Sequence, residues 1–279
     1  MIEAILLAMS GAAAGVFGAL LGLGGGILIV PILTLGFGLG FREAVAVSLL
    51  AVITTSSAGA AVYLQRRVAN LRLGMTLELA TAIGGLVGGL VAFALDQRLL
   101  SGVFALMLAY VAVTMLRRGR GPEPVSEPPA IVEAGTPGSF EASLGGPGYS
   151  VRRLPLGLAL SLVAGLQSAL LGVGGGTIKV PAMHVAMGAP LRVAAATSNV
   201  MIGITASASA VLYLLRGAVD PYVAGPVVVG VFVGASVASR LASRVPINVL
   251  RLLFVVVLGY VAIEMGLRAF GISLLGRPT

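Results

Sequence analysis

The sequence contains no cysteine, no tryptophan and only one histidine, His184. The lack of cysteine excludes a disulfide, a thiolate metal site and a cysteine nucleophile, and a single histidine cannot build a polyhistidine metal site. Charged residues are also scarce, at 10% of 279 residues, whereas a soluble domain has roughly 25%. No His-Glu-x-x-His motif and no cluster of carboxylates for acid–base catalysis is present. We therefore expect no enzyme, no metal site and no cofactor.

The chain consists largely of long apolar segments instead. Hydrophobic residues make up 58% of it, and the mean hydropathy is +1.06. A helix needs ~20 apolar residues to cross ~30 Å of hydrocarbon, and the segments lack the alternation of a membrane β-barrel. The first and the fifth are nearly twice too long for one crossing, so each holds two spans or a re-entrant pair. We predict an all-α polytopic, multi-pass membrane protein with eight to ten membrane segments and Gly-broken helices. The segments run over residues 4–41, 44–64, 73–95, 99–116, 154–191, 193–215, 222–241 and 247–267.

The chain also repeats itself. LLGLGGGILIVP at residues 20–31 returns as LLGVGGGTIKVP at residues 170–181, a shift of 150 positions (170 minus 20). The same shift pairs Arg42 with Arg192 and Tyr63 with Tyr213, which indicates an internal duplication. Between the copies lies a stretch rich in proline, glycine and glutamate. We predict a first transmembrane repeat at 1–117, a flexible cytoplasmic linker at 118–153 and a second transmembrane repeat at 154–279.

The arginines indicate how the repeats are oriented. The net charge is +8, but most arginines lie between apolar segments, as membrane topology requires, so we expect no nucleic acid as a partner. The number of basic residues on the cytoplasmic side differs between the inverted and the parallel arrangement by only one residue, in favour of inversion. Inversion is favoured because an even number of crossings in each long first segment leaves an odd total per half. We predict inverted-topology repeats, with the loops near Arg67 and Arg244 inside and both termini outside.

A glycine cluster interrupts each long first segment. Consecutive glycines unwind a membrane helix, and unwound backbone at this depth occurs where protein or a water-filled cavity satisfies it. The helix that resumes after the break offers free N–H groups to an anion. The alternative is that the glycines only allow close helix packing. We predict that the two breaks converge on a substrate site near the midplane, formed by Gly24, Gly25 and Gly26 and by Gly174, Gly175 and Gly176.

Lys179 follows the second cluster, where the first half has Ile29. A lysine at membrane depth costs roughly 2.5–3.5 kcal/mol on insertion scales. We predict that Lys179 attracts the substrate anion, or a carboxylate that the anion displaces. Its alternative is a side chain that extends to the membrane interface. Because a charge at this depth is costly, we expect Lys179→Met to insert at least as well as the native chain.

Small polar side chains are the remaining substrate-binding candidates. They can donate hydrogen bonds to an oxyanion or only bond a neighbouring helix backbone. The candidates are Ser48, Ser57, Thr197, Ser198 and Asn199, with Thr54, Thr55, Ser56, Thr205 and Ser207 in the same segments. Glu78, Glu264 and His184 are weaker candidates for coupling a proton. The glycines at 84, 85, 88, 89, 230 and 234 favour helix packing.

The motifs GLGGGILIVP and GVGGGTIKVP, followed by AVAVSL and AAATSN, resemble the TauE/SafE-type sulfite exporter family, also called the toluenesulfonate uptake permease family. The similarity covers both halves. It implies a multi-pass permease of the cytoplasmic (inner) cell membrane for sulfite, thiosulfate, sulfonates or related organic anions. We therefore expect a secondary transporter that moves a small anion through the lipid bilayer by alternating access, with a coupling proton or ion. A passive anion channel, a membrane enzyme and a structural subunit are the alternatives.

Overall fold

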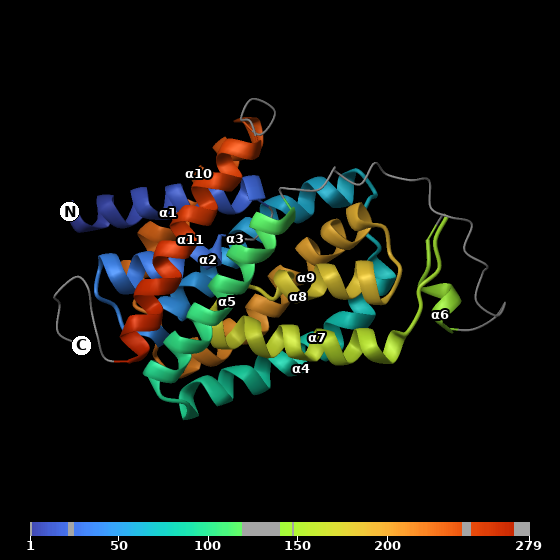
Figure 1. Ribbon diagram of the computed structural model, residues 1–279, viewed down its shortest axis with the longest axis horizontal. Helices are drawn as coiled ribbons and strands as arrows, with labels where there is room; N and C mark the ends of the chain where they lie inside the picture. The colour runs from blue at the N-terminus through green and yellow to red at the C-terminus, as the bar shows by residue number, and fades with distance from the viewer. Residues whose placement is uncertain (1, 22–24, 119–139, 147, 242–246, 271–279) are drawn as a thin grey trace.

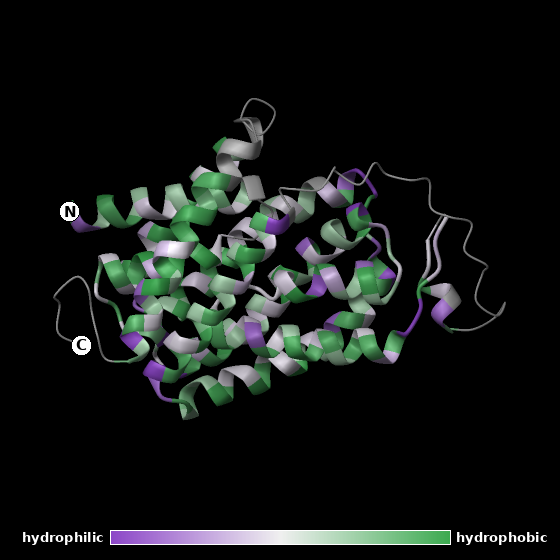
Figure 2. Cartoon of the chain, in the orientation of Figure 1, coloured by the Kyte–Doolittle hydropathy of each residue, from purple (hydrophilic) through white to green (hydrophobic). Residues whose placement is uncertain are grey.

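The computed structural model describes residues 2–21, 25–118, 140–146, 148–241 and 247–270, and these form a bundle of helices (Figure 1). Eight helices are long and apolar enough to cross a membrane, and hydrophobic residues dominate them (Figure 2). The prediction of an all-α polytopic membrane protein is confirmed. The elements are α1 (Ile2–Leu21), α2 (Gly26–Pro31), η1 (Ile32–Gly36), α3 (Phe41–Gln65), α4 (Leu71–Ala94), α5 (Gln97–Arg118), α6 (Phe140–Ser143), α7 (Leu154–Leu171), α8 (Gly176–Pro181), η2 (Ala182–Ala186), α9 (Leu191–Leu215), α10 (Pro221–Leu241) and α11 (Ile247–Ala269).

Each long first segment forms one long helix and one short helix that turns back. The six residues of α8 continue into the five of η2. At the rise of a helix, α8 and η2 together span about 16 Å, which is half of the hydrocarbon layer. Gly175 lies beside Ala164, and Gly157 beside Met187, so α8 and η2 run antiparallel to α7. Proline has no N–H for the helix ladder, and in both halves a π-helical turn begins directly after it.

The two halves pack on each other in an interleaved way. The first helix of each half packs on a helix of the other half. α1 packs on α10, and α7 packs on α4, which is the equivalent of α10 in the first repeat. Both contacts are made by glycines, whose added Cβ atoms would overlap backbone of the partner helix. Gly84 faces Leu162, and Gly234 faces Ala12. The prediction that these glycines serve helix packing is therefore confirmed.

Two helix pairs join elements that are equivalent in the repeats, α3 with α9 and α5 with α11. In the first pair Gly59 faces Asn199 and Ser56 faces Gly203, so residue numbers rise along one helix as they fall along the other. The same holds for α5 and α11, where Gly102 faces Ala269 and Gly266 faces Ala105. In these two pairs the equivalent helices are thus antiparallel.

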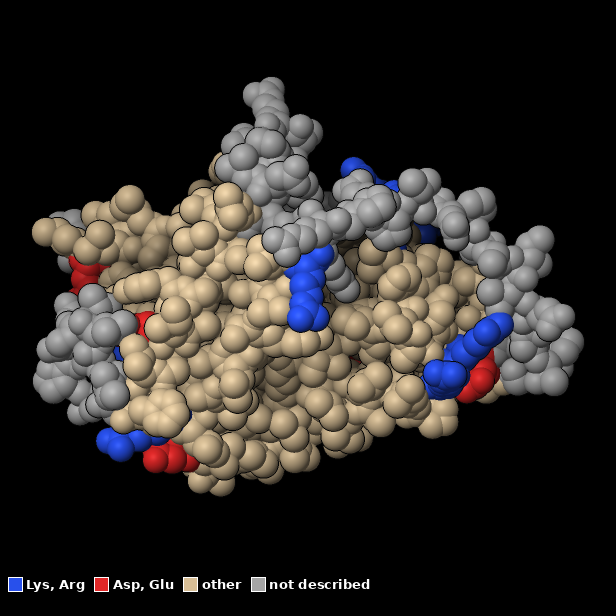
Figure 3. Space-filling model, viewed as in Figure 1, with Lys and Arg blue, Asp and Glu red and all other residues tan. Residues whose placement is uncertain are grey.

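The bundle has two polar ends. At the first, named here the Arg42 end, the Nε and Nη2 atoms of Arg42 donate to the carbonyls of Ala92 and Leu95 at the end of α4, and Arg268 donates to the carbonyl of Thr34. The start of α1 and the end of α11 lie toward this end in Figure 1, opposite α6. On the face in Figure 3 most charged side chains lie toward the ends, and the surface between is largely uncharged.

At the other end, named the Asn70 end, part of the predicted linker is packed. The Nδ2 atom of Asn70 donates to the carbonyl of Leu144 at 2.8 Å and to the hydroxyl of Tyr149 at 2.7 Å. Burial raises the pKa of the Tyr149 phenol, which keeps it neutral at physiological pH. Val151 is also buried. Residues 119–139 of the predicted linker lie outside the described residues.

Candidate functional site

A buried ion pair lies inside the bundle. Lys179 comes from α8, Glu78 from α4 and Thr205 from α9. The Nζ atom of Lys179 lies 3.4 Å from the Oε2 atom of Glu78 and donates to the hydroxyl of Thr205 at 2.5 Å. That hydroxyl lies 2.6 Å from the Oε1 atom of Glu78, to which it donates. The three residues are 1%, 3% and 0% exposed for Lys179, Glu78 and Thr205, so solvent does not reach the cluster.

The sequence positions these groups through ordinary helix geometry. The glycine break ends α7 and lets α8 restart inside the bundle, where the amide of Lys179 donates to the carbonyl of Gly175 at 3.1 Å. The side chain then reaches Glu78 on α4 and Thr205 on α9. Each charge alone would be costly at this depth, and pairing with an additional hydrogen bond offsets that cost. Among the residues that the structure describes, this is the one salt bridge.

Sequence reasoning predicted part of this cluster. Lys179 was expected to meet either a substrate or a carboxylate, and the carboxylate is Glu78. The alternative of a lysine extending to the interface is wrong, since its side chain is 1% exposed. Glu78 is a weaker candidate in the sequence because it lies near the start of an apolar segment. The signal that could have predicted this pair is the presence of two opposite charges, Lys179 and Glu78, within apolar segments of a chain that has few charges.

The pairing also corrects one expectation about variants. Lys179→Met was expected to insert at least as well as the native chain. Removing one partner of a buried pair leaves the other charge uncompensated, which costs about 3–5 kcal/mol. The single variant is therefore expected to be destabilised through Glu78.

The two glycine breaks meet at the centre of the bundle. A Cβ atom on Gly26 would overlap the carbonyl oxygen of Gly172 and would lie 2.9 Å from the hydroxyl of Ser48. That hydroxyl lies 2.7 Å from the carbonyl oxygen of Gly172 and 3.3 Å from that of Gly26. Ser48 therefore joins the unwound backbone of one half to the other half. The convergence expected from the sequence is present, and it is tightly packed.

The other predicted glycines lie around this junction. Gly25 and Gly175 each precede a short helix with φ of 75° and 72°, a left-handed conformation that suits glycine. Gly174 packs against Ile202, and Gly176 lies beside Ile202 and Ser198. Gly24 lies outside the described residues.

The predicted polar residues divide into two groups. Ser48 and Ser198 lie at the junction, and Ser198 is 1% exposed with no hydrogen-bond partner among the described residues. Thr205 lies at the ion pair, and the structure does not bring the following candidates there. Ser57 donates to the carbonyl of Ile53 in its own helix, Thr197 accepts from the amide of Asn70, the carbonyl of Asn199 accepts from Ser56, and the Nδ1 atom of His184 lies 2.9 Å from the carbonyl oxygen of Ala189, to which it donates.

Cavities open at the ends of the bundle. One of about 870 Å³ lies at the Arg42 end and is lined by Arg42, Arg98 and Arg268. Another of about 460 Å³ lies at the Asn70 end and is lined by Arg67, Arg72 and Tyr149. Neither includes Lys179 or Glu78 in its lining. The ion pair is thus separate from both cavities.

Comparison with known proteins identifies the family of the chain. The model of the sulfite exporter TauE/SafE family matches residues 7–265. The chain belongs to the TauE/SafE family. It is thus a multi-pass membrane transporter of that family, and the suspected resemblance is confirmed. No solved structure matches the chain.

Curated relatives of this TauE/SafE chain carry transporter names. It is 24% identical to the probable membrane transporter protein YunE of Bacillus subtilis (strain 168), over 91% of this chain and 95% of the relative. It is 26% identical to a probable membrane transporter protein of Xylella fastidiosa (strain 9a5c), over 84% and 83% of the two chains. The match to the probable membrane transporter protein MamO of Magnetospirillum gryphiswaldense is 27% identical and covers 93% of this chain but 44% of the relative.

Proposed function

We propose that the protein is a secondary transporter of a small anion, with Lys179 as the cation that binds it. The observation that carries this proposal is a lysine that is 1% exposed in the interior of a membrane bundle. Such a charge is costly and persists where function needs it. The substrate class is sulfite, thiosulfate, a sulfonate or a related organic anion, and the location is the cytoplasmic membrane.

Alternating access is the proposed mode of transport. The ion pair is closed to solvent, whereas basic cavities lie at both ends of the bundle. An anion that enters from either cavity would reach Lys179 only after helices move. A passive channel would instead keep a continuous polar path. Saturable flux would support the transporter, and flux that rises linearly with anion concentration would favour the channel.

Inverted topology is part of the same proposal. Two antiparallel helices that are equivalent in a duplicated chain are related by a two-fold axis perpendicular to them. The antiparallel pairs α3–α9 and α5–α11 support such an axis in the membrane plane. The interleaved packing of α1 on α10 and α7 on α4 fits the same symmetry. In a transporter with inverted repeats, the two halves can exchange conformations, and this exchange converts the outward-facing state into the inward-facing state.

The test is anion exchange in proteoliposomes. Purified protein is first screened for thermal stabilisation by sulfite, thiosulfate, sulfate, sulfonates and carboxylates. Vesicles loaded with the stabilising anion should then take up the labelled anion in exchange, at least tenfold above protein-free vesicles. The double variant Lys179→Met/Glu78→Gln keeps the site free of unpaired charge and should lose this exchange. Normal exchange by the double variant would overturn the role of Lys179.

A further inference from the structure

The cluster around Lys179 holds a carboxylate that the binding of an anion does not by itself require. An anion at Lys179 would meet Glu78, whose Oε2 atom is 3.4 Å from the same Nζ atom. Two negative groups against one cation leave a net negative charge in a site that solvent does not reach. Like charges at such distance oppose each other strongly at low dielectric. The anion and the ionised carboxylate therefore compete for Lys179.

We propose that Glu78 is the proton-coupling residue, and that it takes up one proton for each anion that Lys179 binds. The proton comes from water on the loading side, joins a Glu78 oxygen, and leaves to water on the other side after the anion departs. Protonated Glu78 no longer neutralises the charge of Lys179, and the bound anion neutralises it instead. This inference rests on the proposed transport function and adds the coupling ion to it.

Thr205 is built to tolerate both states of Glu78. Its hydroxyl has one proton and two acceptors within reach, the Oε1 atom of Glu78 at 2.6 Å and the carbonyl oxygen of Met201 at 3.0 Å. While Glu78 is ionised, the hydroxyl donates to the carboxylate. When Glu78 is protonated, its own O–H can donate to the Thr205 oxygen, and Thr205 then donates to Met201. The hydroxyl of Thr205 and the carboxyl group of Glu78 therefore keep a hydrogen-bond partner in either state.

Other titratable groups near the cluster do not substitute for Glu78. Among the described residues of α4, of α7 and α9 that pack on it, and of α8 and η2 that pack on α7 and α9, no other carboxylate occurs. The remaining groups are directed elsewhere: Arg72 and Arg192 are exposed, the His184 ring bonds to the carbonyl of Ala189, and the hydroxyl of Tyr213 donates to the carbonyl of Ala169.

Glu264 provides a matched control. It is the other fully buried carboxylate among the described residues, at 0% exposed, but it lies in α11. Neither of its oxygens has a hydrogen-bond partner within the described part of the chain, and no cation pairs with it there. If burial alone made a carboxylate couple protons, Glu264 would serve as well as Glu78.

The experiment uses thiosulfate and methanesulfonate, which exchange no proton themselves near neutral pH. Proteoliposomes contain a pH-sensitive dye, and a pH gradient is imposed. The native protein should accumulate the labelled anion against its gradient, and anion entry should move protons. Glu78→Gln should retain anion exchange within about threefold, yet lose at least tenfold of both the gradient-driven accumulation and the proton flux. Glu264→Gln and His184→Gln should keep all three.

Each outcome decides one level of the proposal. Gradient-driven accumulation by Glu78→Gln, or its loss in Glu264→Gln, would overturn the role of Glu78. Native exchange without any proton movement would overturn coupling and leave the transport function intact. A native protein that exchanges neither these probes nor any anion selected by thermal screening would remove the transport function itself.

A measurement on the native protein covers the case in which Glu78→Gln does not fold. Calorimetric titration of thiosulfate in buffers of different ionisation heat gives the number of protons taken up on binding. The expected value is about one, with an affinity that weakens about tenfold per pH unit once Glu78 is ionised. Binding without proton uptake would contradict the proposal.

Discussion

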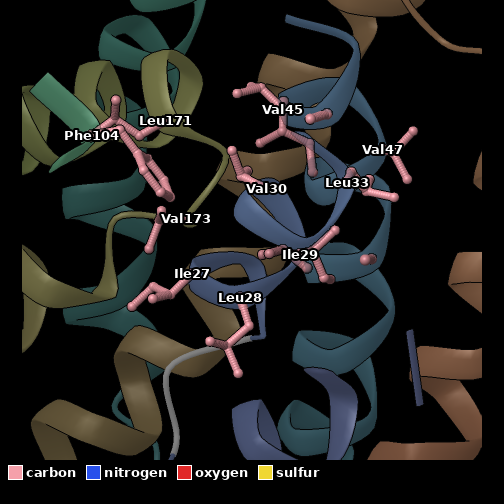
Figure 4. Close-up of a cluster of buried hydrophobic side chains, with 14 of the residues drawn as sticks. Ile27, Leu28, Ile29, Val30, Leu33, Val45, Val47, Phe104, Leu171 and Val173 are labelled. Atoms are coloured by element: carbon pink, nitrogen blue, oxygen red, sulfur yellow. The ribbon is translucent and has the colours of Figure 1, made fainter. Parts of the chain in front are cut away.

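In the second half of the molecule α8 carries Lys179 at the position where α2 of the first half carries Ile29. The shift of 150 places Glu78 opposite Val228 and Thr205 opposite Thr55. Ile29 is 2% exposed and lies among the apolar side chains around Val30, Leu33 and Val47 (Figure 4). Both halves thus have the glycine break and the short returning helix, but only the second carries a lysine on that helix. The duplicated backbone supplies the scaffold, and the chemistry comes from Lys179 and Thr205 of the second half together with Glu78 of the first.

The largest expected effect tests whether the halves are inverted. Arg66 and Arg216 are equivalent by the shift of 150, and both are exposed. In an inverted arrangement, cysteines placed singly at these positions are labelled by an impermeant reagent from opposite sides of the membrane. The native chain has no cysteine, so background labelling is absent. Cysteines at Arg67 and Arg244 should share the cytoplasmic side. Labelling of Arg66→Cys and Arg216→Cys from one side would make the repeats parallel.

The second prediction concerns variants at Lys179 and at the equivalent Ile29, the position at which the two short helices differ in charge. Lys179→Met should lower stability by about 3–5 kcal/mol because Glu78 is left buried and unpaired. Lys179→Met/Glu78→Gln should regain most of that loss while transport remains absent. Ile29→Met, at the equivalent position, should change stability by less than about 1.5 kcal/mol, since volume is nearly conserved. Thermal unfolding in detergent and exchange in vesicles measure the two effects. A double variant as unstable as the single one would show that Glu78 is not the cause.

The third prediction compares the two breaks as scaffold. Gly25 and Gly175 both have positive φ, so an alanine at either costs about 1–2 kcal/mol in backbone strain. A Cβ atom on Gly175 would also lie 2.6 Å from the carbonyl oxygen of Ala164, whereas on Gly25 the nearest atom lies at 3.4 Å. Gly175→Ala should therefore be the more destabilising by about 1–3 kcal/mol. Gly259→Ala, with open space around it, serves as the control. Equal losses at both breaks would show that the junction relaxes freely.

The sequence predicted the scaffold better than the site. Long apolar segments and the duplication follow from composition and spacing, because lipid admits few backbone solutions. Gly84 and Gly234 could be assigned to packing for the same reason. The partner of Lys179 could not, since Glu78 is 101 residues away in sequence and only the packing of α4 against α9 brings it near. Ser57 and Thr197 do not bond to the ion pair, and their placement could not be predicted because a small polar residue in a helix has no sequence signal for the direction it faces.

The smallest expected effect concerns the hydroxyl between the charges. Thr205→Val keeps the shape of the side chain and removes the donor to the Oε1 atom of Glu78, a hydrogen bond to a charged group that contributes about 1.5–3 kcal/mol. The equivalent Thr55 donates to the carbonyl of Val52 in its own helix, and loss of this hydrogen bond between neutral groups in Thr55→Val should cost about 0.5–1.5 kcal/mol. Because Thr205 also serves protonated Glu78, Thr205→Val should slow proton-driven uptake more than anion exchange at equal pH. Thr205→Ser retains the hydroxyl and should restore the ratio of the two rates. If Thr205→Val lowers both rates equally, the hydroxyl only stabilises the pair, and the switch between two acceptors plays no part in coupling.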